Sequence, residues 1–208
     1  MTAQERKENT EKLFEEHGLP PLQYELPPME EDAEINVRSG DEIARRLLVL
    51  GYLNCVAVQP DLNEQVIQFL IQENLWSLVS DRERVIFETT NLSEEDHDYV
   101  AWRNESIWLM LWAIMKIDAL EFPADELNPG QLVRLIPQFF EPVGSFATQA
   151  VTRSKTEIMD QADLHFRLCW AVREHEQNAS AVLPFVAGVA FERHFALEWI
   201  KNVRDEWE

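Results

Sequence analysis

Two segments near the C-terminus carry apolar and aromatic residues on nearly every side of a helix, with charged residues between them. They are residues 157–171, EIMDQADLHFRLCWA, and residues 189–200, VAFERHFALEWI. A helix that is apolar all round belongs in the interior of a protein. A charge in that interior is costly unless another group pairs with it. The two segments therefore predict a helical core in which charged side chains are held by partners.

The composition favours helices over strands. Hydrophobic residues make up 46% of the 208 residues, enough for a sizeable core, and the chain has only 6 Gly and few β-branched runs. We expect a single all-α domain, a bundle of six to eight helices, over residues 38–208. Residues 1–37 begin with a weak helix and continue with four prolines and an acidic run. Because proline interrupts helices, we expect an extended, acidic N-terminal arm there.

Capping signals place several helices within the domain. Ser39 and Glu42 form a capping box before a helix that ends ahead of Pro60, and Asp61 offers a cap for the next helix. Asn128 offers a cap for a short helix that reaches residue 136. Residues 76–92 fit a short strand or a helical turn equally well. We expect the core to contain a central helix over residues 94–120 and two final helices over residues 145–177 and 184–203.

The charge balance limits the classes of partner. The chain has 18 Lys and Arg against 38 Asp and Glu, a net charge of −20. Nucleic acid and anionic membranes need a cationic surface, so both are disfavoured as partners. A basic protein partner is compatible, because opposite charge speeds and orients encounter.

The cysteines and the N-terminus point to the cytoplasm. Cys55 and Cys169 lie in apolar helical stretches without metal-ligand spacing, so we expect buried, reduced thiols. The N-terminal residues contain no apolar signal region. The most apolar run, residues 107–115, is too short to span a bilayer.

The charged residues of the two final helices form the candidate site. Asp163 and Arg167 are four residues apart and can pair on one helix face. We expect a structural network in which Asp160 or Asp163 pairs with Arg193, and Glu192 with Arg167. The alternative is a polar pocket between the last two helices that uses carboxylates and histidines as acids, bases or ligands. Its residues are Glu157, Asp160, His165, Glu192 and His194.

Other chemistry has weaker signals. A mixed nitrogen and oxygen metal site would need His165 joined by Asp160 or Asp163, and His194 joined by Glu192. The acidic run after Ser93 is typical of a helix N-terminus rather than of a calcium loop. The sequence contains no nucleophile elbow and no glycine-rich phosphate loop. We therefore predict no catalytic residue, no metal and no cofactor.

Four blocks of the sequence, taken in order, resemble a bacterial family, the domain of unknown function numbered 4272. They are RSGDEIARRLLVL at 38–50, WRNE with LWA within 102–113, residues 157–171, and FERHFALEW at 191–199. The resemblance spans residues 38–203 and implies a soluble, mainly helical domain with no established activity. The family pattern tends to have Asn at Glu198 and Tyr near Phe191. The polar positions that the resemblance singles out are Arg38, Glu105, Glu157, Asp160, Asp163, Arg167, Glu192, Arg193 and His194.

These features favour a non-enzymatic interaction protein whose acidic surface holds a basic protein partner. A toxin-neutralising immunity protein of the bacterial cytoplasm would fit this size and charge. The alternative is an enzyme, or a protein that binds a small ligand or metal in the pocket between the last two helices. The sequence leaves the oligomeric state open.

Overall fold

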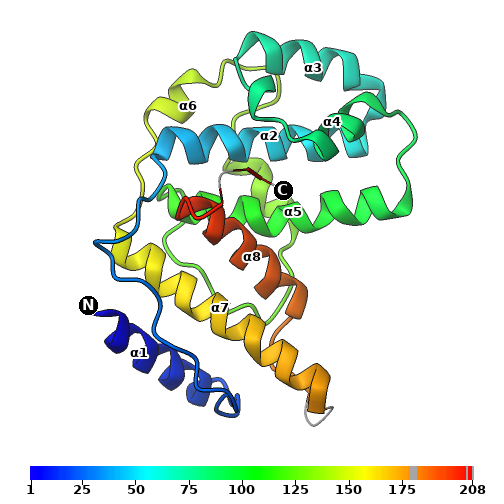
Figure 1. Cartoon of the computed structure of the whole chain (residues 1–208). Coiled ribbons are helices and arrows are strands. Elements are labelled where there is room, and N and C mark those ends of the chain that lie inside the picture. Colours follow the sequence, from blue (N-terminus) through cyan, green and yellow to red (C-terminus); the bar gives the residue numbers. More distant parts are fainter. Residues whose placement is uncertain (179–181, 205, 208) are drawn as a thin grey trace. The chain divides into compact units, whose positions relative to one another are not determined.

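The structure is a computed structural model that describes residues 1–178, 182–204 and 206–207, and helices joined by loops make up this part of the chain (Figure 1). The described residues contain eight α-helices and three short 3-10 helices and no β-strand. The expected all-α fold is therefore confirmed. None of the helices in these residues is long and apolar enough to cross a bilayer.

The chain forms two compact units. Unit 1 comprises residues 1–37, 121–126 and 153–204, and unit 2 comprises residues 38–120, 127–152 and 205–208. This grouping differs from the arm and single domain that we expected from the sequence. The first 37 residues belong to the same unit as the two long C-terminal helices.

Unit 2 is built around two long helices, α2 (Gly40–Val58) and α5 (Glu94–Ala113). Capping boxes begin both of them, as the side chain of Ser39 accepts from the backbone of Glu42 and that of Ser93 from the backbone of Asp96. The predicted cap at Ser39 is thus confirmed. The remaining elements of unit 2 are η1 (Pro60–Leu62), α3 (Asn63–Gln72), η2 (Trp76–Leu78), α4 (Asp81–Glu88), η3 (Pro129–Arg134) and α6 (Gly144–Thr148).

Several boundaries in unit 2 differ from the expected ones. No side chain caps α3, which follows η1 directly, so the cap predicted at Asp61 is wrong. Residues 81–88 are helical, which decides the ambiguous segment. The central helix ends at Ala113 and not at residue 120, because Met115 adopts a φ of 59°. The backbone N–H of Lys116 then donates to the carbonyl of Leu111, 2.8 Å away, which closes the helix end.

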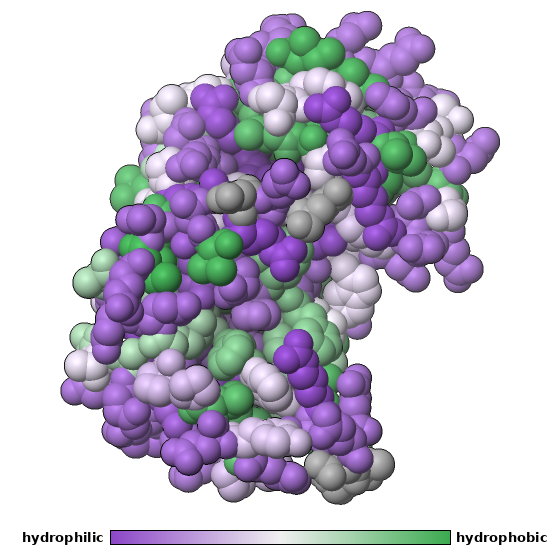
Figure 2. All heavy atoms as spheres, in the orientation of Figure 1, coloured by the Kyte–Doolittle hydropathy of each residue, from purple (hydrophilic) through white to green (hydrophobic). Residues whose placement is uncertain are grey.

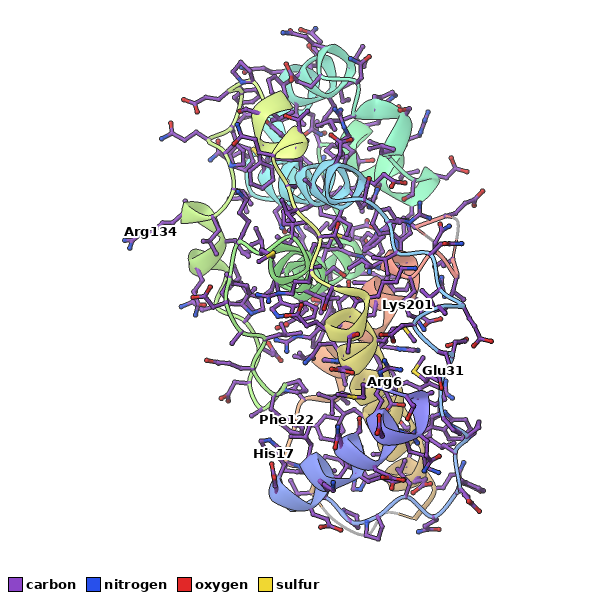
Figure 3. All side chains as sticks on the ribbon, turned by 90° about the vertical axis from the view of Figure 1, so that its left-hand side faces the viewer. Arg6, His17, Glu31, Phe122, Arg134 and Lys201 are labelled. Carbon is purple, nitrogen blue, oxygen red and sulfur yellow. The ribbon has the colours of Figure 1, made fainter. Side chains whose placement is uncertain are left out.

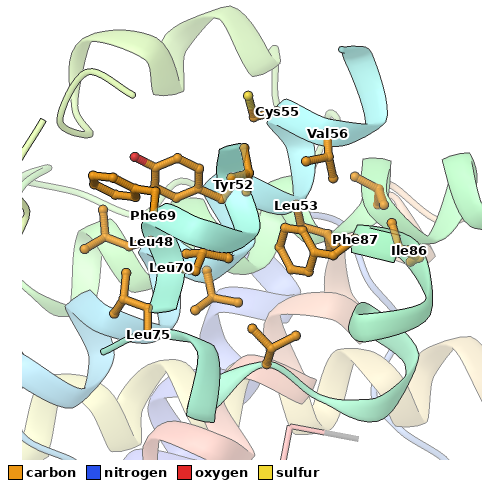
Figure 4. Close-up of a cluster of buried hydrophobic side chains, with 14 of the residues drawn as sticks. Leu48, Tyr52, Leu53, Cys55, Val56, Phe69, Leu70, Leu75, Ile86 and Phe87 are labelled. Carbon is orange, nitrogen blue, oxygen red and sulfur yellow. The ribbon is translucent and has the colours of Figure 1, made fainter. Parts of the chain in front are cut away.

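The core of unit 2 forms where α2 meets α3 and α4. Leu48, Tyr52 and Leu53 on α2 pack with Phe69 on α3 and Phe87 on α4 (Figure 4). Tyr52 and Leu53 follow Leu48 by four and five residues, which keeps the three side chains on adjoining faces of α2. Full burial of a leucine or phenylalanine side chain contributes about 1.5–3 kcal/mol.

Unit 1 consists of three helices, α1 (Ala3–Glu16), α7 (Lys155–Asn178) and α8 (Ala187–Ile200). Phe14 of α1 packs with Leu164 and Leu168 of α7 in its core. The rings of His17 and Phe122 stack with their centres 3.7 Å apart, and Figure 3 shows them side by side. The helix expected over residues 145–177 is wrong, because the chain forms α6, leaves the helix at residue 149 and begins α7 at Lys155.

The face of the molecule in Figure 2 is mainly hydrophilic. Figure 2 shows hydrophilic side chains over most of one face, with separate hydrophobic patches between them. Unit 1 carries 20 Asp and Glu against 10 Lys and Arg, and unit 2 carries 18 against 8. Each unit therefore has a net charge of −10, so the acidity is shared by the whole chain.

Candidate functional site

The charged residues that the sequence singles out on α7 hold the N-terminal segment in place. Asp163 and Arg167 are 0% and 1% exposed, and the Arg167 guanidinium donates to both Asp163 oxygens at 2.9 and 3.0 Å. Arg167 Nη2 also donates to the carbonyl of Pro27 at 3.1 Å. The pairing of Asp163 with Arg167 that their spacing allows is therefore present, and the carbonyl of Pro27 completes it. The expected pairing of Arg167 with Glu192 is wrong, because Arg167 is engaged by these two groups.

A second contact of this kind lies about two helical turns nearer the start of α7. Arg6 of α1 is buried between Asp160 and Asp32, with 3.0 Å from its Nε to Asp160 Oδ1. Figure 3 shows Arg6 and Glu31 close together beside α7. Burial raises the pKa of Asp160, although its hydrogen bond with Arg6 acts in the opposite direction. Asp160 therefore pairs with Arg6 and Asp163 with Arg167, whereas we expected one of these two carboxylates to pair with Arg193.

Contacts with the N-terminal segment continue along the whole of α7. Glu174 accepts from the backbone N–H groups of Gln23 and Tyr24 at 2.9 and 3.0 Å, and Lys155 donates to the carbonyl of Ile35 at 2.6 Å. Glu174, Arg167 and Asp160 are spaced by seven residues, so they share one face of the helix. The segment therefore runs antiparallel to α7, and the charges along α7 satisfy its backbone and side chains.

His165 of the hypothesised pocket is buried, and His194 is half-buried. His165 is fully buried, and its Nδ1 lies 2.9 Å from the carbonyl of Gln161. Because a carbonyl only accepts, Nδ1 carries the hydrogen, and Nε2 has no hydrogen-bond partner among the described residues. Burial lowers the pKa of His165 to about 3, and the positive charge of Arg193 adds to this effect. Burial also lowers the pKa of His194 on α8.

Four more of the predicted residues have structural partners. Glu157 accepts from the hydroxyl and backbone of Ser154 and lies 2.9 Å from Arg153, so it caps the start of α7. Arg193 donates to the carbonyl of Glu121 at 2.9 Å. Three others complete the set: Arg38 lies 3.5 Å from Glu42, buried Glu105 accepts from the backbone of Leu127 at 2.6 Å, and Glu192 is half-buried on α8.

The described residues hold no group of three or more His, Cys, Asp or Glu side chains that could bind a metal ion. Glu157 and Asp160 of the hypothesised pocket are instead engaged with Ser154, Arg153 and Arg6. These partners support the structural interpretation of the charged helix faces.

A cavity in unit 2 is a different kind of site. It has a volume of about 740 Å³ and is lined by α2, by residues 97–107 of α5, by η3 and by the loop that follows η3. Gly51, Asn54, Cys55 and Val58 of α2 face it, with the spacing of three and four residues that defines one helix face. Ligand sites commonly have volumes of about 300–1,000 Å³, mainly apolar walls and a few polar groups. This cavity has those properties.

The polar groups at the wall form an ordered chain. Asn104 Nδ2 on α5 donates to the carbonyl of Ala101 at 2.8 Å, and Asn54 Nδ2 on α2 donates to Asn104 Oδ1 at 2.9 Å. Burial raises the pKa of the neighbouring Cys55 thiol, so the thiol stays protonated and is a poor nucleophile. The site is therefore suited to binding.

Tyr52 and Glu73 bind the loop that follows η3, at the edge of the cavity. The hydroxyl oxygen of Tyr52 accepts from the backbone N–H of Phe140 at 2.8 Å, and Glu73 accepts from that of Val143 at 3.2 Å. The ring of Phe139 lies 5.0 Å from that of Tyr52. These contacts fix the wall that Phe139 provides.

We did not predict this cavity from the sequence. Asn54 shares a face with apolar residues of α2, whereas Asn104 lies between Arg103 and Glu105 on α5. The single amide side chain in each of these two helices was the available signal. The η3 segment and its loop, which complete the wall, carry no signal of their own.

Comparison with known proteins identifies one family. The model of the family described as Domain of unknown function (DUF4272) matches residues 6–208. The match thus begins well before residue 38, where the resemblance seen in the sequence began, and it includes most of α1 and the segment along α7. No curated protein and no solved structure matches the chain.

Proposed function

The chain belongs to the DUF4272 family, whose description assigns no activity, and we propose from its structure that it is a binding protein. In this proposal, unit 2 takes an apolar part of a basic protein partner into the cavity between α2, α5 and η3. The partner's positive charge is attracted by the acidic surface around it.

The observation that carries the proposal is the rim of the cavity. Val58, Val133 and Phe139 line the cavity and are 79%, 73% and 42% exposed. Large apolar side chains that gather around an apolar cavity leave a hydrophobic area in water, and such areas mark interaction sites. A bound protein segment would cover both the cavity and its rim.

Charge favours a basic partner. Unit 2 has a net charge of −10, Asp98 lines the cavity, and the first turn of α5 adds Glu94, Glu95 and Asp96. Opposite charge raises association rates and disfavours acidic competitors. A toxin-neutralising immunity protein in the bacterial cytosol is one protein of this kind. The two buried, free cysteines support a reducing compartment.

A peptide selection tests the proposal. The full chain is used at low salt to select binders from a displayed library of random peptides. We expect the selected peptides to carry more Lys and Arg than Asp and Glu, together with at least one large apolar residue. Their affinity should fall with added salt, because exposed charges are screened.

Gly51 offers a matched pair of variants for the same test. A Cβ at Gly51 would meet only the Ile136 Cδ1 atom, at 3.5 Å, so an added side chain extends into the cavity without a backbone clash. Gly51→Leu should weaken peptide binding at least tenfold, and Gly51→Ala should leave it within about twofold. Peptides that bind Gly51→Leu as well as the unchanged chain, or that are acidic, would contradict the proposed function.

A further inference from the structure

We infer that the cavity recognises a tryptophan side chain of the partner and that Asn54 accepts the hydrogen bond of its indole N–H. This inference rests on the proposed function and specifies the group that enters the cavity. It depends on the orientation of the Asn54 amide, on the apolar walls of the cavity and on the number of ligand N–H groups that can find an acceptor there.

The orientation of Asn54 is fixed from α5. The carbonyl of Ala101 only accepts, so Asn104 must turn its NH₂ group toward it, at 2.8 Å. Asn104 therefore presents its oxygen to Asn54, and Asn54 must donate through its own NH₂ group, at 2.9 Å. The Oδ1 atom of Asn54 therefore takes no part in this chain of hydrogen bonds.

Asn54 Oδ1 is available to a ligand. It accepts no hydrogen bond from any residue that the structure describes, and it is not among the enclosed polar atoms that lack a partner. Asn54 is half-buried and lines the cavity, so this oxygen is reached from the cavity. A bound group that buried the oxygen without donating to it would cost about 1–3 kcal/mol.

The walls select the kind of donor. Val100, Ile107 and Leu132 give the cavity an apolar interior, and Asp98 is the one carboxylate among its lining residues. Asp98 precedes Asn104 by six residues on α5, which is about 9 Å along the helix. The positive charge of an ammonium group at Asn54 would lie far from the Asp98 carboxylate and would be poorly compensated. A neutral N–H needs only a single acceptor.

An indole matches these conditions. It has one donor and no acceptor, so a single hydrogen bond to Asn54 Oδ1 satisfies it. Its remaining surface is apolar, and Phe139 at the rim offers an aromatic edge or face for contact. Tryptophan is also among the residues that contribute most at protein interfaces.

Two small probes test the inference on the full chain. Indole and benzofuran have nearly the same shape, but benzofuran lacks the N–H. We expect ligand-observed NMR titrations to show indole binding at least tenfold more tightly than benzofuran. In Asn54→Leu this preference should fall to within about twofold. Gln59→Leu, which changes another polar residue of the lining, should keep the full preference.

The selected peptides supply the second arm of the test. Replacing their tryptophan by phenylalanine should weaken binding at least tenfold to the unchanged chain and by less than about twofold to Asn54→Leu. Equal binding of indole and benzofuran, or an unchanged preference in Asn54→Leu that circular dichroism shows to be folded, would overturn the inference. The effect of Gly51→Leu on peptide binding would still decide the proposed function separately.

Discussion

Asp163 and Arg167 are buried charges that are stabilised by each other and by a backbone carbonyl of the N-terminal segment. Asp163 accepts two hydrogen bonds from Arg167, and Arg167 Nη2 also donates to the carbonyl of Pro27. Each group would be costly alone in this environment. The pair therefore supports the attachment of the N-terminal segment to α7 rather than any reaction.

Breaking this pair should be costly. We expect Asp163→Leu to lower the free energy of unfolding by about 3–5 kcal/mol, because it leaves the Arg167 charge buried and unpaired. The double variant with Arg167→Met should recover part of that loss. Urea unfolding gives both values. Glu11→Gln, which removes an exposed carboxylate 3.9 Å from Lys7, should change stability by less than about 1 kcal/mol. A loss at Asp163 no larger than at Glu11 would show that the pair is not buried.

His165 should make the protein less stable in acid. Its pKa is near 6.5 in the unfolded chain and about 3 in the folded chain. Between these values the unfolded chain binds the proton and the folded chain does not, so stability is lost as the pH falls. This loss approaches about 1.4 kcal/mol per pH unit below 6.5. His165→Asn keeps a donor for Gln161 and should show a shallower decline between pH 6.5 and 4 in urea unfolding. Equal slopes would mean that His165 does not titrate in this way.

At the scale of the elements, the backbone conformation at the end of α5 should lower the free energy of unfolding, and this can be tested. Met115 is 56% exposed and adopts a φ of 59°, a region that disfavours residues with a Cβ atom. Met115→Gly should raise the free energy of unfolding by about 1 kcal/mol, whereas Met115→Ala should bring no such gain. Thermal unfolding compares the two variants. If alanine stabilised as much as glycine, the backbone conformation would not be the cause.

Local signals predicted elements well, and distant contacts could not be predicted. The capping box at Ser39 located α2, and the same pattern at Ser154 and Glu157 marks the start of α7. We missed the second box and expected one continuous helix over residues 145–177. The partner of Asp160 is Arg6, 154 residues away, and no local pattern identifies such a pair. The cavity depends on η3 and its loop, whose positions also follow from distant contacts.

At the scale of the whole molecule, the first 37 residues are part of a folded unit. Phe14 and Leu19 pack with Leu164, Leu168 and Val172, and the charged face of α7 binds the segment that follows α1. The family match from residue 6 onward agrees with this arrangement. The proline-containing segment after α1 lies outside the helices, but three of its apolar side chains are buried: Leu19, Leu26 and Ile35.

Removal of residues 1–37 should therefore unfold unit 1. Asp160, Arg167 and Glu174 would lose their partners, and the apolar face of α7 would be exposed to water. We expect hydrogen exchange in α7 and α8 to become fast in the truncated chain, with slow exchange retained in α2 and α5. Slow exchange throughout α7 after truncation would show that the segment is a dispensable arm.

The central claim is that unit 2 binds its partner in the cavity between α2, α5 and η3. A crystal structure of the full chain with a selected basic peptide tests it most directly. The account predicts a peptide side chain inside the cavity, covered by Val58, Val133 and Phe139, with a donor within hydrogen-bond distance of Asn54 Oδ1. A peptide bound elsewhere on the acidic surface, with the cavity unoccupied, would contradict it.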